Sequence, residues 1–310
     1  MSKVKPRPEL PELERPSLEQ VTFEEMRSTL LKAASGEEEL SARLRMLSAP
    51  PKDEEDDQET VLLVSFPRSG NTLLRAYVEK VSALVTGSDS DVGMKLNRVL
   101  FQQGLVGEGL ADKQVHLVKS HFPERYGKAK FFAERAVLLV RNPVDCLASL
   151  FHMICSGSHN ASIADSDFIK FKSEWSQFLQ QDISVWKDFH DFWLNSTVPL
   201  HIVRYEDLVS DPSSTLENLF KFLLNTKEIE GTVVQKMIAL AVADASPPEI
   251  YKPRQAKING SFDKFDSSQL QFLYNYTEQL LQMFSYTDAF KSHGLDSASL
   301  AKPGASWSGK

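Results

Sequence analysis

The sequence predicts an α/β protein of the P-loop nucleotide-binding type, in which a parallel sheet forms the middle of three layers and helices flank it. Four short apolar runs, at residues 60–64, 115–118, 136–140 and 200–203, have the length and composition of strands that are buried on both faces. Stretches with the apolar spacing of helices separate these runs. Strands that alternate with helices favour a parallel sheet covered on both faces.

Apolar spacing also predicts where the helices lie. A helix is expected directly after the first strand, because Leu73, Leu74, Tyr77 and Val78 recur at helical spacing. The longest helical stretch is predicted over residues 167–194, and its aromatic stripe is interpreted as core packing. Further helices are expected, in chain order, at residues 23–33, 37–47, 215–224, 232–242 and 267–284.

Length and composition indicate one large domain with additions at both ends. The chain has 310 residues, of which 42% are hydrophobic, and this is enough to bury a full core. Residues 1–59 are expected to form an accessory segment that ends in an acidic linker, since residues 51–59 carry one lysine against six acidic side chains. The core domain is predicted over residues 60–288, followed by a loose tail over residues 289–310.

Charge and cysteine content limit the partners and the compartment. The formal net charge of −7 falls mainly on residues 1–59, so the core is nearly neutral and does not suggest a nucleic-acid-binding surface. Cys146 and Cys155 lack the second pair that a metal site would need, and free thiols suit a reducing compartment. No apolar run reaches the length of a membrane span, and the first residues do not resemble a secretory signal. The sequence therefore favours a soluble, cytoplasmic protein, although a removed targeting segment would leave the same pattern.

The first strand leads into a polar loop, Ser65-Phe66-Pro67-Arg68-Ser69-Gly70-Asn71-Thr72, and then into a helix. This order lets the loop amides and the positive end of the helix dipole surround one anion. The loop departs from the Walker pattern, because Ser65 stands at the first glycine and Asn71 at the lysine. Arg68 is the cation within the loop, and its planar guanidinium suits an oxyanion without a metal ion. The loop therefore predicts a phosphorylated ligand and disfavours a magnesium-triphosphate site.

Polar residues also follow the other strands. Lys119 and His121 close the second strand, and His121 can face the loop because the carboxyl ends of parallel strands share one crevice. A histidine with a pKa of about 6.5 can take a proton from a hydroxyl group at neutral pH. The third strand leads into Arg141-Asn142-Pro143, which suits a capped helix that carries Ser149 two turns along. The fourth strand leads into Tyr205, and the two acidic residues after it can cap the next helix.

Four of these segments resemble the motifs of sulfotransferases that use 3′-phosphoadenylyl sulfate (PAPS). Residues 66–72 resemble the loop that holds the 5′-phosphosulfate, and residues 119–123 resemble the Lys-Thr-His-Leu-Pro segment of the cytosolic members. Residues 141–149 resemble the site of the 3′-phosphate, and Tyr205 begins a segment similar to the family's Tyr-Glu-Asp. The resemblance covers residues 61–264 in the family's order.

The resemblance implies a transferase that moves a sulfuryl group from PAPS to the hydroxyl group of a small alcohol, a phenol or a carbohydrate, without a metal ion. His121 would act as general base, Lys119 would assist at the sulfuryl or bridging oxygen, and Arg68 would neutralise the leaving group. The residues expected to bind PAPS are Arg68, Ser69, Gly70, Asn71, Thr72, Leu73, Arg141, Ser149, Tyr205, Ser246, Arg254 and Lys257.

The sequence also departs from the family. Leu73 stands where cytosolic members carry a tryptophan near the adenine, and Arg68 replaces their lysine. The family's Arg-Lys-Gly element is poorly kept, so Arg254 and Lys257 remain alternatives for covering the 3′-phosphate. Residues 152–168 are interpreted as a lid or acceptor loop, but their composition does not identify the acceptor.

Two other functions stay open at this point. A P-loop kinase or nucleotide hydrolase is disfavoured by Asn71, and a non-catalytic nucleotide-binding scaffold is disfavoured by the presence of both Lys119 and His121. The sequence leaves the oligomeric state undecided, a homodimer included.

Overall fold

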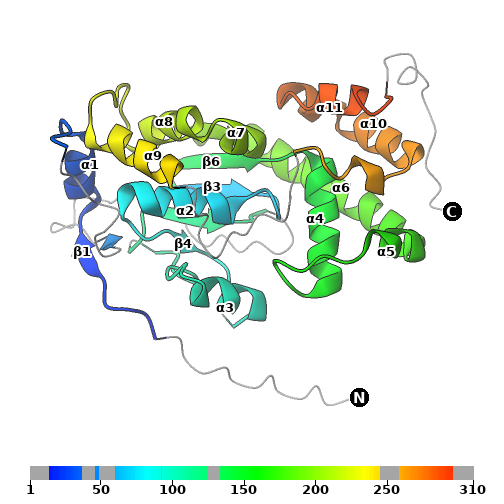
Figure 1. Ribbon diagram of the computed structural model, residues 1–310, viewed down its shortest axis with the longest axis horizontal. Coiled ribbons are helices and arrows are strands. Elements are labelled where there is room, and N and C mark those ends of the chain that lie inside the picture. The colour runs from blue at the N-terminus through cyan, green and yellow to red at the C-terminus, as the bar shows by residue number, and fades with distance from the viewer. Residues whose placement is uncertain are drawn as a thin grey trace.

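The computed structural model describes residues 14–36, 46–48, 60–91, 93–112, 114–123, 133–244 and 258–295. Its centre is a five-stranded sheet with the strand order β4-β5-β3-β6-β7, in which every neighbouring pair is parallel (Figure 1). The strands are β3 (Val61–Ser65), β4 (Gly87–Ser88), β5 (Leu117–Ser120), β6 (Arg135–Val140) and β7 (Leu200–Arg204). The predicted parallel α/β fold is therefore confirmed.

Buried apolar residues line both faces of the sheet. Along β3, Leu62 and Val64 belong to one buried cluster, whereas Val61 and Leu63 belong to the other. This is the alternation that a strand imposes on successive side chains. Because all five residues of β3 are buried, the strand is seen in the sequence as a continuous apolar run.

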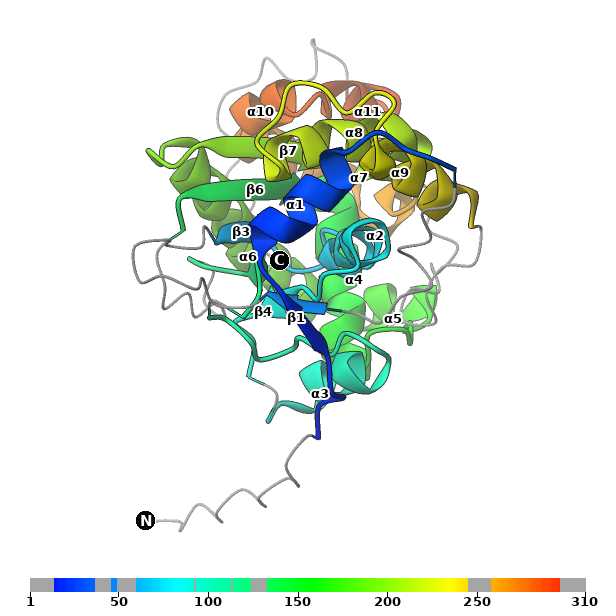
Figure 2. The same ribbon diagram turned by 90° about the vertical axis from the view of Figure 1, so that its left-hand side faces the viewer.

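Helices form a layer on each side of the sheet. The helices α1, α8 and α2 each contact α9, and α4, α5 and α10 each contact α6. In Figure 1 the first group lies toward the left and the second toward the right, and Figure 2, viewed from the left-hand side of Figure 1, has α1 in front. The helices are α1 (Phe23–Leu31), α2 (Asn71–Ser82), α3 (Lys95–Gln102), α4 (Pro143–Ser156), α5 (Asp165–Lys170), α6 (Lys172–Leu194), α7 (Tyr205–Ser210), α8 (Pro212–Leu223), α9 (Val233–Ala243), the 3-10 turn η1 (Phe262–Lys264), α10 (Ser267–Met283) and α11 (Thr287–Lys291).

The aromatic stripe of the long helix packs in the core, as predicted. Trp175, Trp186 and Phe189 are at most 2% exposed and belong to the cluster that α6 shares with α4 and α10. The predicted single helix over residues 167–194 is wrong, however, because Phe171 leaves helical geometry (φ −106°, ψ 38°) and divides the stretch into α5 and α6.

The N-terminal segment also differs from expectation. Residues 46–48 form strand β2 (Met46–Ser48), which pairs in parallel with β1 (Glu19–Val21), so the predicted helix over residues 37–47 is wrong at its carboxyl end. The remainder of that prediction falls on residues 37–45, which lie outside the described part of the chain. At the other end, α11 crosses residue 289, where the tail was expected to begin, and its Phe290 is fully buried.

Strand β5 begins later than the apolar run that predicted it. It pairs with β3 from Val61 opposite Leu117 to Val64 opposite Ser120. Lys119 and Ser120 therefore lie within the sheet, and His121 is the first residue beyond it. This register places His121 at the carboxyl edge of the sheet, next to the loop that follows β3.

Candidate functional site

The loop between β3 and α2 has the geometry of an anion cradle. Arg68 (φ +69°) and Gly70 (φ +102°) both adopt left-handed backbone conformations, and Gly70 is the N-cap of α2. A glycine has no side chain to cap the first amides of the helix, so these amides can face a ligand. A Cβ atom at Gly70 would lie 2.4 Å from Cδ2 of Tyr205, so only glycine fits against this ring.

Arg68 contacts α4, the helix that carries Ser149, the residue predicted from the sequence to bind the 3′-phosphate. Its Nε donates a hydrogen bond of 3.1 Å to Oγ of Ser149. Arg141 approaches from the end of β6, where its Nη1 donates a bond of 2.9 Å to the carbonyl oxygen of Arg68. The guanidinium of Arg141 also lies over the ring of Tyr205, 4.4 Å from its centroid. Three segments far apart in the sequence thus meet beside the loop.

The turn that carries Arg141 is held by a buried carboxylate. Asn142 caps α4, since its side-chain oxygen accepts from Val144 N at 3.0 Å. The backbone amide of Asn142 donates to Oε1 of Glu206 at 3.0 Å. The hydroxyl group of Tyr286 donates to Oε2 of the same carboxylate at 2.7 Å. Burial raises the pKa of Glu206, while these two bonds oppose that rise. Glu206 therefore anchors the Arg141 turn to α7.

His121 is oriented by the backbone of β3. Its Nδ1 lies 2.6 Å from the carbonyl oxygen of Ser65, and because that oxygen only accepts, Nδ1 carries the proton. In the neutral ring Nε2 then has the lone pair. Burial, reinforced by the charge of Lys119, holds the pKa of His121 well below its usual value, although the bond to Ser65 acts in the opposite direction. The ring is therefore neutral at neutral pH and able to accept a proton at Nε2.

Two more polar side chains extend this arrangement. Asn71, at the position of the Walker lysine, donates to Oγ of Ser65 at 3.2 Å and so closes the loop on its own strand. Lys119 is 7% exposed, and its Nζ donates to Oγ of Ser90 at 2.8 Å. Ser90 follows β4 and was not singled out in the sequence, because nothing local to it suggests a contact with β5.

Three more of the predicted site residues lie in the loop or at the start of α2, and three others fall outside the described part of the chain. Ser69 is fully buried, with its Oγ 3.5 Å from Sγ of Cys146, and Thr72 lies in the first turn of α2. Leu73 is buried in the same apolar cluster as Tyr205. Ser246, Arg254 and Lys257 lie outside the described residues.

Sequence reasoning missed one anchor of the segment that follows residue 257. Both carboxylate oxygens of Asp145 accept backbone bonds, at 2.9 Å from Asn259 and 3.1 Å from Ser261. The side-chain amide of Asn142 donates to Asn259 at 3.0 Å. More than a hundred residues separate the partners, so no local pattern announces these contacts. Residues 259–261 are therefore fastened to the same turn that presents Arg141.

Comparison with known proteins identifies the family. Residues 58–246 match the family model of the sulfotransferase domain. The chain belongs to the sulfotransferase domain family. Membership supports sulfotransfer as the general activity of this sulfotransferase domain.

Individual relatives of the sulfotransferase domain differ in how they are named. WSCD family member AAEL009094 of Aedes aegypti is 33% identical over 174 residues, which cover 54% of this chain and 50% of the relative. Sulfotransferase 6B1 of Danio rerio is 24% identical over 165 residues, which cover 52% of this chain and 51% of the relative. The chain spans about half the length of these curated relatives. Among solved structures, mouse sulfotransferase SULT7A1 complexed with PAP aligns with a TM-score of 0.49 and 13% identity, over 76% of this chain and 88% of that one.

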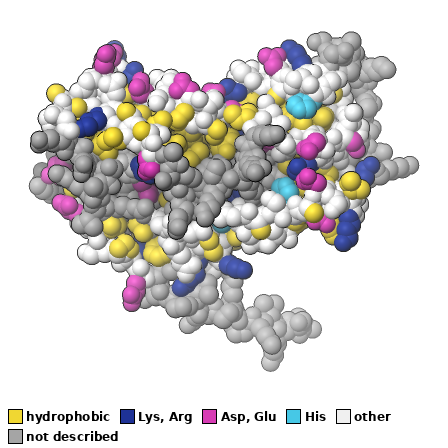
Figure 3. Space-filling model, viewed as in Figure 1, with side chains coloured by type: hydrophobic (Ala, Val, Ile, Leu, Met, Phe, Trp, Pro, Cys, Tyr) yellow, Lys and Arg dark blue, Asp and Glu magenta, His cyan; other side chains and the backbone are white. Residues whose placement is uncertain are grey.

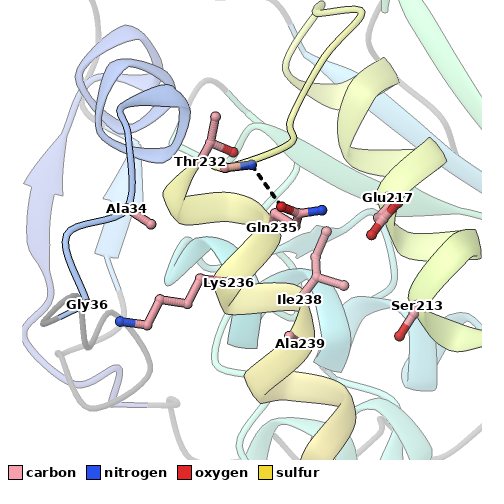
Figure 4. Close-up of a pocket in the computed structure, with 10 residues that line it drawn as sticks. Ala34, Gly36, Ser213, Glu217, Thr232, Gln235, Lys236, Ile238 and Ala239 are labelled. Carbon is pink, nitrogen blue, oxygen red and sulfur yellow. Dashed lines mark hydrogen bonds between the residues drawn. The ribbon is translucent and has the colours of Figure 1, made fainter.

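A surface depression lies elsewhere on the sulfotransferase domain. It measures about 480 Å³ and is lined by residues of α8, of α9 with the turn before it, and of the stretch that follows α1, among them Glu217, Gln235 and Lys236 (Figure 4). Gln235 accepts a bond of 2.8 Å from the amide of Gly231, and the lining contains none of the predicted site residues. We therefore place the candidate site at the loop after β3 and not in this depression.

The described surface of the sulfotransferase domain has mixed character. On the face shown in Figure 3, acidic and basic side chains are interspersed with hydrophobic ones. Within the described ranges, no three His, Cys, Asp or Glu side chains gather in the way that a bound metal ion needs. Across those same residues, no helix has both the length and the apolar composition of a membrane span.

Proposed function

We propose that this protein transfers the sulfuryl group of PAPS to an acceptor hydroxyl group. The observation that carries the proposal is the meeting of Arg68, Ser149, Arg141 and Tyr205 beside a helix N-terminus, with His121 bonded to the strand that leads into it. Such an arrangement offers two anion sites and a base at the carboxyl edge of one parallel sheet, where ligands of open α/β folds bind.

The residues fit a donor with two phosphate groups. Amides of the loop from Arg68 to Thr72 would hold the 5′-phosphosulfate, because they lie at a glycine-capped helix N-terminus; the Ser69 amide already donates to the carbonyl oxygen of Phe66 at 3.3 Å. Arg141 and Ser149 would hold the 3′-phosphate, with the Arg141 guanidinium already oriented by Tyr205. Leu73 and Tyr205 would supply apolar contacts for the adenine from one buried cluster. Of the later basic segment, Ser246, Arg254 and Lys257 remain predicted ligands.

The acceptor hydroxyl group would be activated by His121. Its Nε2 lone pair takes the hydroxyl proton while the acceptor oxygen forms a bond to sulfur, and the bond from sulfur to the bridging oxygen of the 5′-phosphate breaks. The products are a sulfate ester, the 3′,5′-bisphosphate of adenosine and a proton on His121. The bond between Nδ1 and Ser65 fixes the tautomer that this step requires.

Charge that develops on the leaving phosphate would be neutralised by Arg68, and Lys119 would assist at the sulfuryl or bridging oxygen. Preorganised cations of this kind commonly supply much of an enzyme's rate enhancement. Lys119 is buried and tethered to Ser90, so its ammonium group is already positioned. None of these steps requires a metal ion.

A radiolabelled-PAPS assay tests the proposal. The full chain is incubated with a panel of phenols, aliphatic alcohols, carbohydrates and tyrosine peptides, and labelled product is separated from donor. We expect transfer to at least one hydroxyl class that survives addition of EDTA. Magnesium-dependent turnover of ATP without transfer would favour a kinase or hydrolase, and binding of adenosine 3′,5′-bisphosphate without transfer to any acceptor would favour a scaffold.

A further inference from the structure

His159 lies in the loop that follows α4 and contacts two distant elements. Its Nδ1 is 3.2 Å from Nη1 of Arg68, and its Nε2 is 3.1 Å from the carbonyl oxygen of Leu96 in α3. The loop was interpreted from sequence as part of a lid or acceptor loop, without any link to the loop after β3. The His159 ring therefore connects Arg68, in the loop after β3, with helix α3.

The two partners determine the tautomer of His159. The Leu96 oxygen only accepts, so Nε2 carries the proton, and the Arg68 guanidinium only donates, so Nδ1 has the lone pair. Burial and the nearby Arg68 charge lower the pKa of His159 to about 4, and this keeps the ring neutral at neutral pH. A protonated ring would present a second N–H group to Arg68 and lose the bond.

The same loop and helix α4 together fix the plane of the Arg68 guanidinium. Nη2 donates to the backbone oxygen of His159 at 3.0 Å, Nη1 to its ring, and Nε to Ser149 at 3.1 Å. Because a guanidinium group is planar and rigid, bonds from all three of its nitrogens define its orientation. The backbone of Arg68 is held as well, since its carbonyl oxygen accepts from Arg141.

We propose that His159 is a positioning residue that sets the orientation of Arg68 for sulfuryl transfer and thereby links the candidate acceptor loop to the donor site. This inference rests on the proposed function, in which Arg68 acts on the leaving phosphate. A group that acts on developing charge must be oriented before the reaction, so loss of orientation lowers kcat more than donor affinity.

Two substitutions distinguish loss of the bond that positions Arg68 from loss of the bond that holds the loop to Leu96. The amide oxygen of His159→Asn can replace the acceptor Nδ1, whereas the amide nitrogen of His159→Gln can replace the donor Nε2 that bonds Leu96. We expect His159→Ala to lower kcat about 10- to 100-fold with a change in donor KM below about threefold. His159→Asn should recover more of kcat than His159→Gln, because it retains the bond to Arg68.

Two results would overturn the inference. One is a kcat of His159→Ala within about twofold of the wild type; the other is equal recovery by Asn and Gln, which would indicate a structural role only. His293→Ala, at an exposed histidine that follows α11, serves as the matched control for a histidine-to-alanine change. If the wild-type protein transfers no sulfate, the proposed function fails instead. In that case nitrogen-15 NMR of the histidine rings still tests whether His159 accepts a hydrogen bond from Arg68, since a proton on Nδ1 of His159 would exclude that bond.

Discussion

Oγ of Ser149 accepts a hydrogen bond of 3.1 Å from Nε of Arg68, although 81 residues separate the two in the chain. The sequence assigned these side chains to opposite ends of PAPS, Arg68 to the 5′-phosphosulfate and Ser149 to the 3′-phosphate. Their contact joins the loop after β3 to helix α4, so under the proposed function both elements would contact one donor. Under the proposed function, we expect the phosphate groups of a bound donor to lie beside this pair of side chains.

Replacement of His121 should remove turnover and leave the donor site intact. His121→Ala loses the proton acceptor, so kcat should fall by about 10² to 10⁴. The residue lies at the edge of the sheet and is bonded to Ser65 O and not to the anion cradle, so binding of adenosine 3′,5′-bisphosphate should persist. Calorimetric titration of that nucleotide measures binding beside the labelled-PAPS assay. Transfer by the variant at the wild-type rate would remove His121 from the mechanism.

The pH dependence of wild-type activity follows from the same residue. A base must be neutral, and activity is lost as pH falls through the pKa of His121, which burial and Lys119 hold well below 6.5. We therefore expect kcat/KM to stay level from about pH 8 down to about pH 6.5, with the acidic limb at lower pH. Circular dichroism at each pH separates this limb from unfolding. An acidic limb centred above pH 6.5 would contradict the assigned environment of His121.

Replacement of Arg141 should raise the KM of the donor and leave the KM of the acceptor unchanged. Arg141→Ala removes the guanidinium that lies over Tyr205 and bonds the Arg68 carbonyl oxygen, so donor KM should rise at least about tenfold. Arg141→Lys keeps the charge but not the planar fork, so it should recover only part of the loss. Lys291→Ala, at an exposed site in α11, controls for the removal of one positive charge. An unchanged donor KM in Arg141→Ala would reject the 3′-phosphate assignment.

The parts of the site that sequence could predict are those fixed by neighbouring residues. The strand, loop and helix around Arg68 follow from an apolar run, a glycine and helical spacing within a short segment. The capped start of α4 follows in the same way from Asn142 and Pro143. In both places local propensity and the final structure agree, which is why the order of the four motifs was informative.

The contacts that sequence could not predict join distant segments. Lys119 in β5 donates a hydrogen bond to Ser90, which follows the neighbouring strand β4. Glu206 accepts a hydrogen bond from Tyr286, which lies 80 residues later in the chain. Helix α5 ends at Phe171 although no proline or glycine stands there to signal the break, and β2 pairs with β1, which lies far from it in the sequence. Each depends on tertiary packing that overrides local preference. The bond between His159 and Arg68 belongs to the same class.

Gly70 should be far less tolerant of alanine than a glycine with the same handedness in open space. Gly231 has a φ of +70°, and a Cβ atom added there would have nothing within 4 Å, whereas a Cβ at Gly70 meets the ring of Tyr205 at 2.4 Å. That ring cannot move aside easily, because it is 3% exposed and Arg141 stacks on it. Gly231→Ala should cost about 1 to 2 kcal/mol for backbone strain. Gly70→Ala should cost about 1 to 3 kcal/mol more.

Urea unfolding of the two glycine variants measures this difference. Nucleotide binding should also weaken in Gly70→Ala, since the displaced ring of Tyr205 carries Arg141 with it. Gly231 lies away from the loop after β3, so its variant should bind the nucleotide normally. Equal destabilisation by both substitutions would show that the Tyr205 ring yields at little cost.

Stability should fall as the solution is made acidic, in part because of His190. This ring is fully buried in α6, with Nδ1 2.6 Å from the carbonyl oxygen of Trp186, and burial lowers its pKa to about 4. Between about pH 6.5 and pH 4 the unfolded chain binds a proton at this residue and the folded chain does not. The free energy of unfolding therefore decreases with falling pH over this window, by up to about 3 kcal/mol from His190.

The non-titrating variant His190→Asn isolates this contribution. Its side-chain amide can still donate to the Trp186 oxygen, so the fold should be retained with some loss of packing. Urea unfolding at several pH values between about 4 and 7 should give a shallower dependence of the unfolding free energy on pH than in the wild type. The difference in slope should approach about 1.4 kcal/mol per pH unit, which corresponds to one proton. Parallel curves for the two proteins would mean that His190 takes up its proton in the folded state as readily as in the unfolded chain.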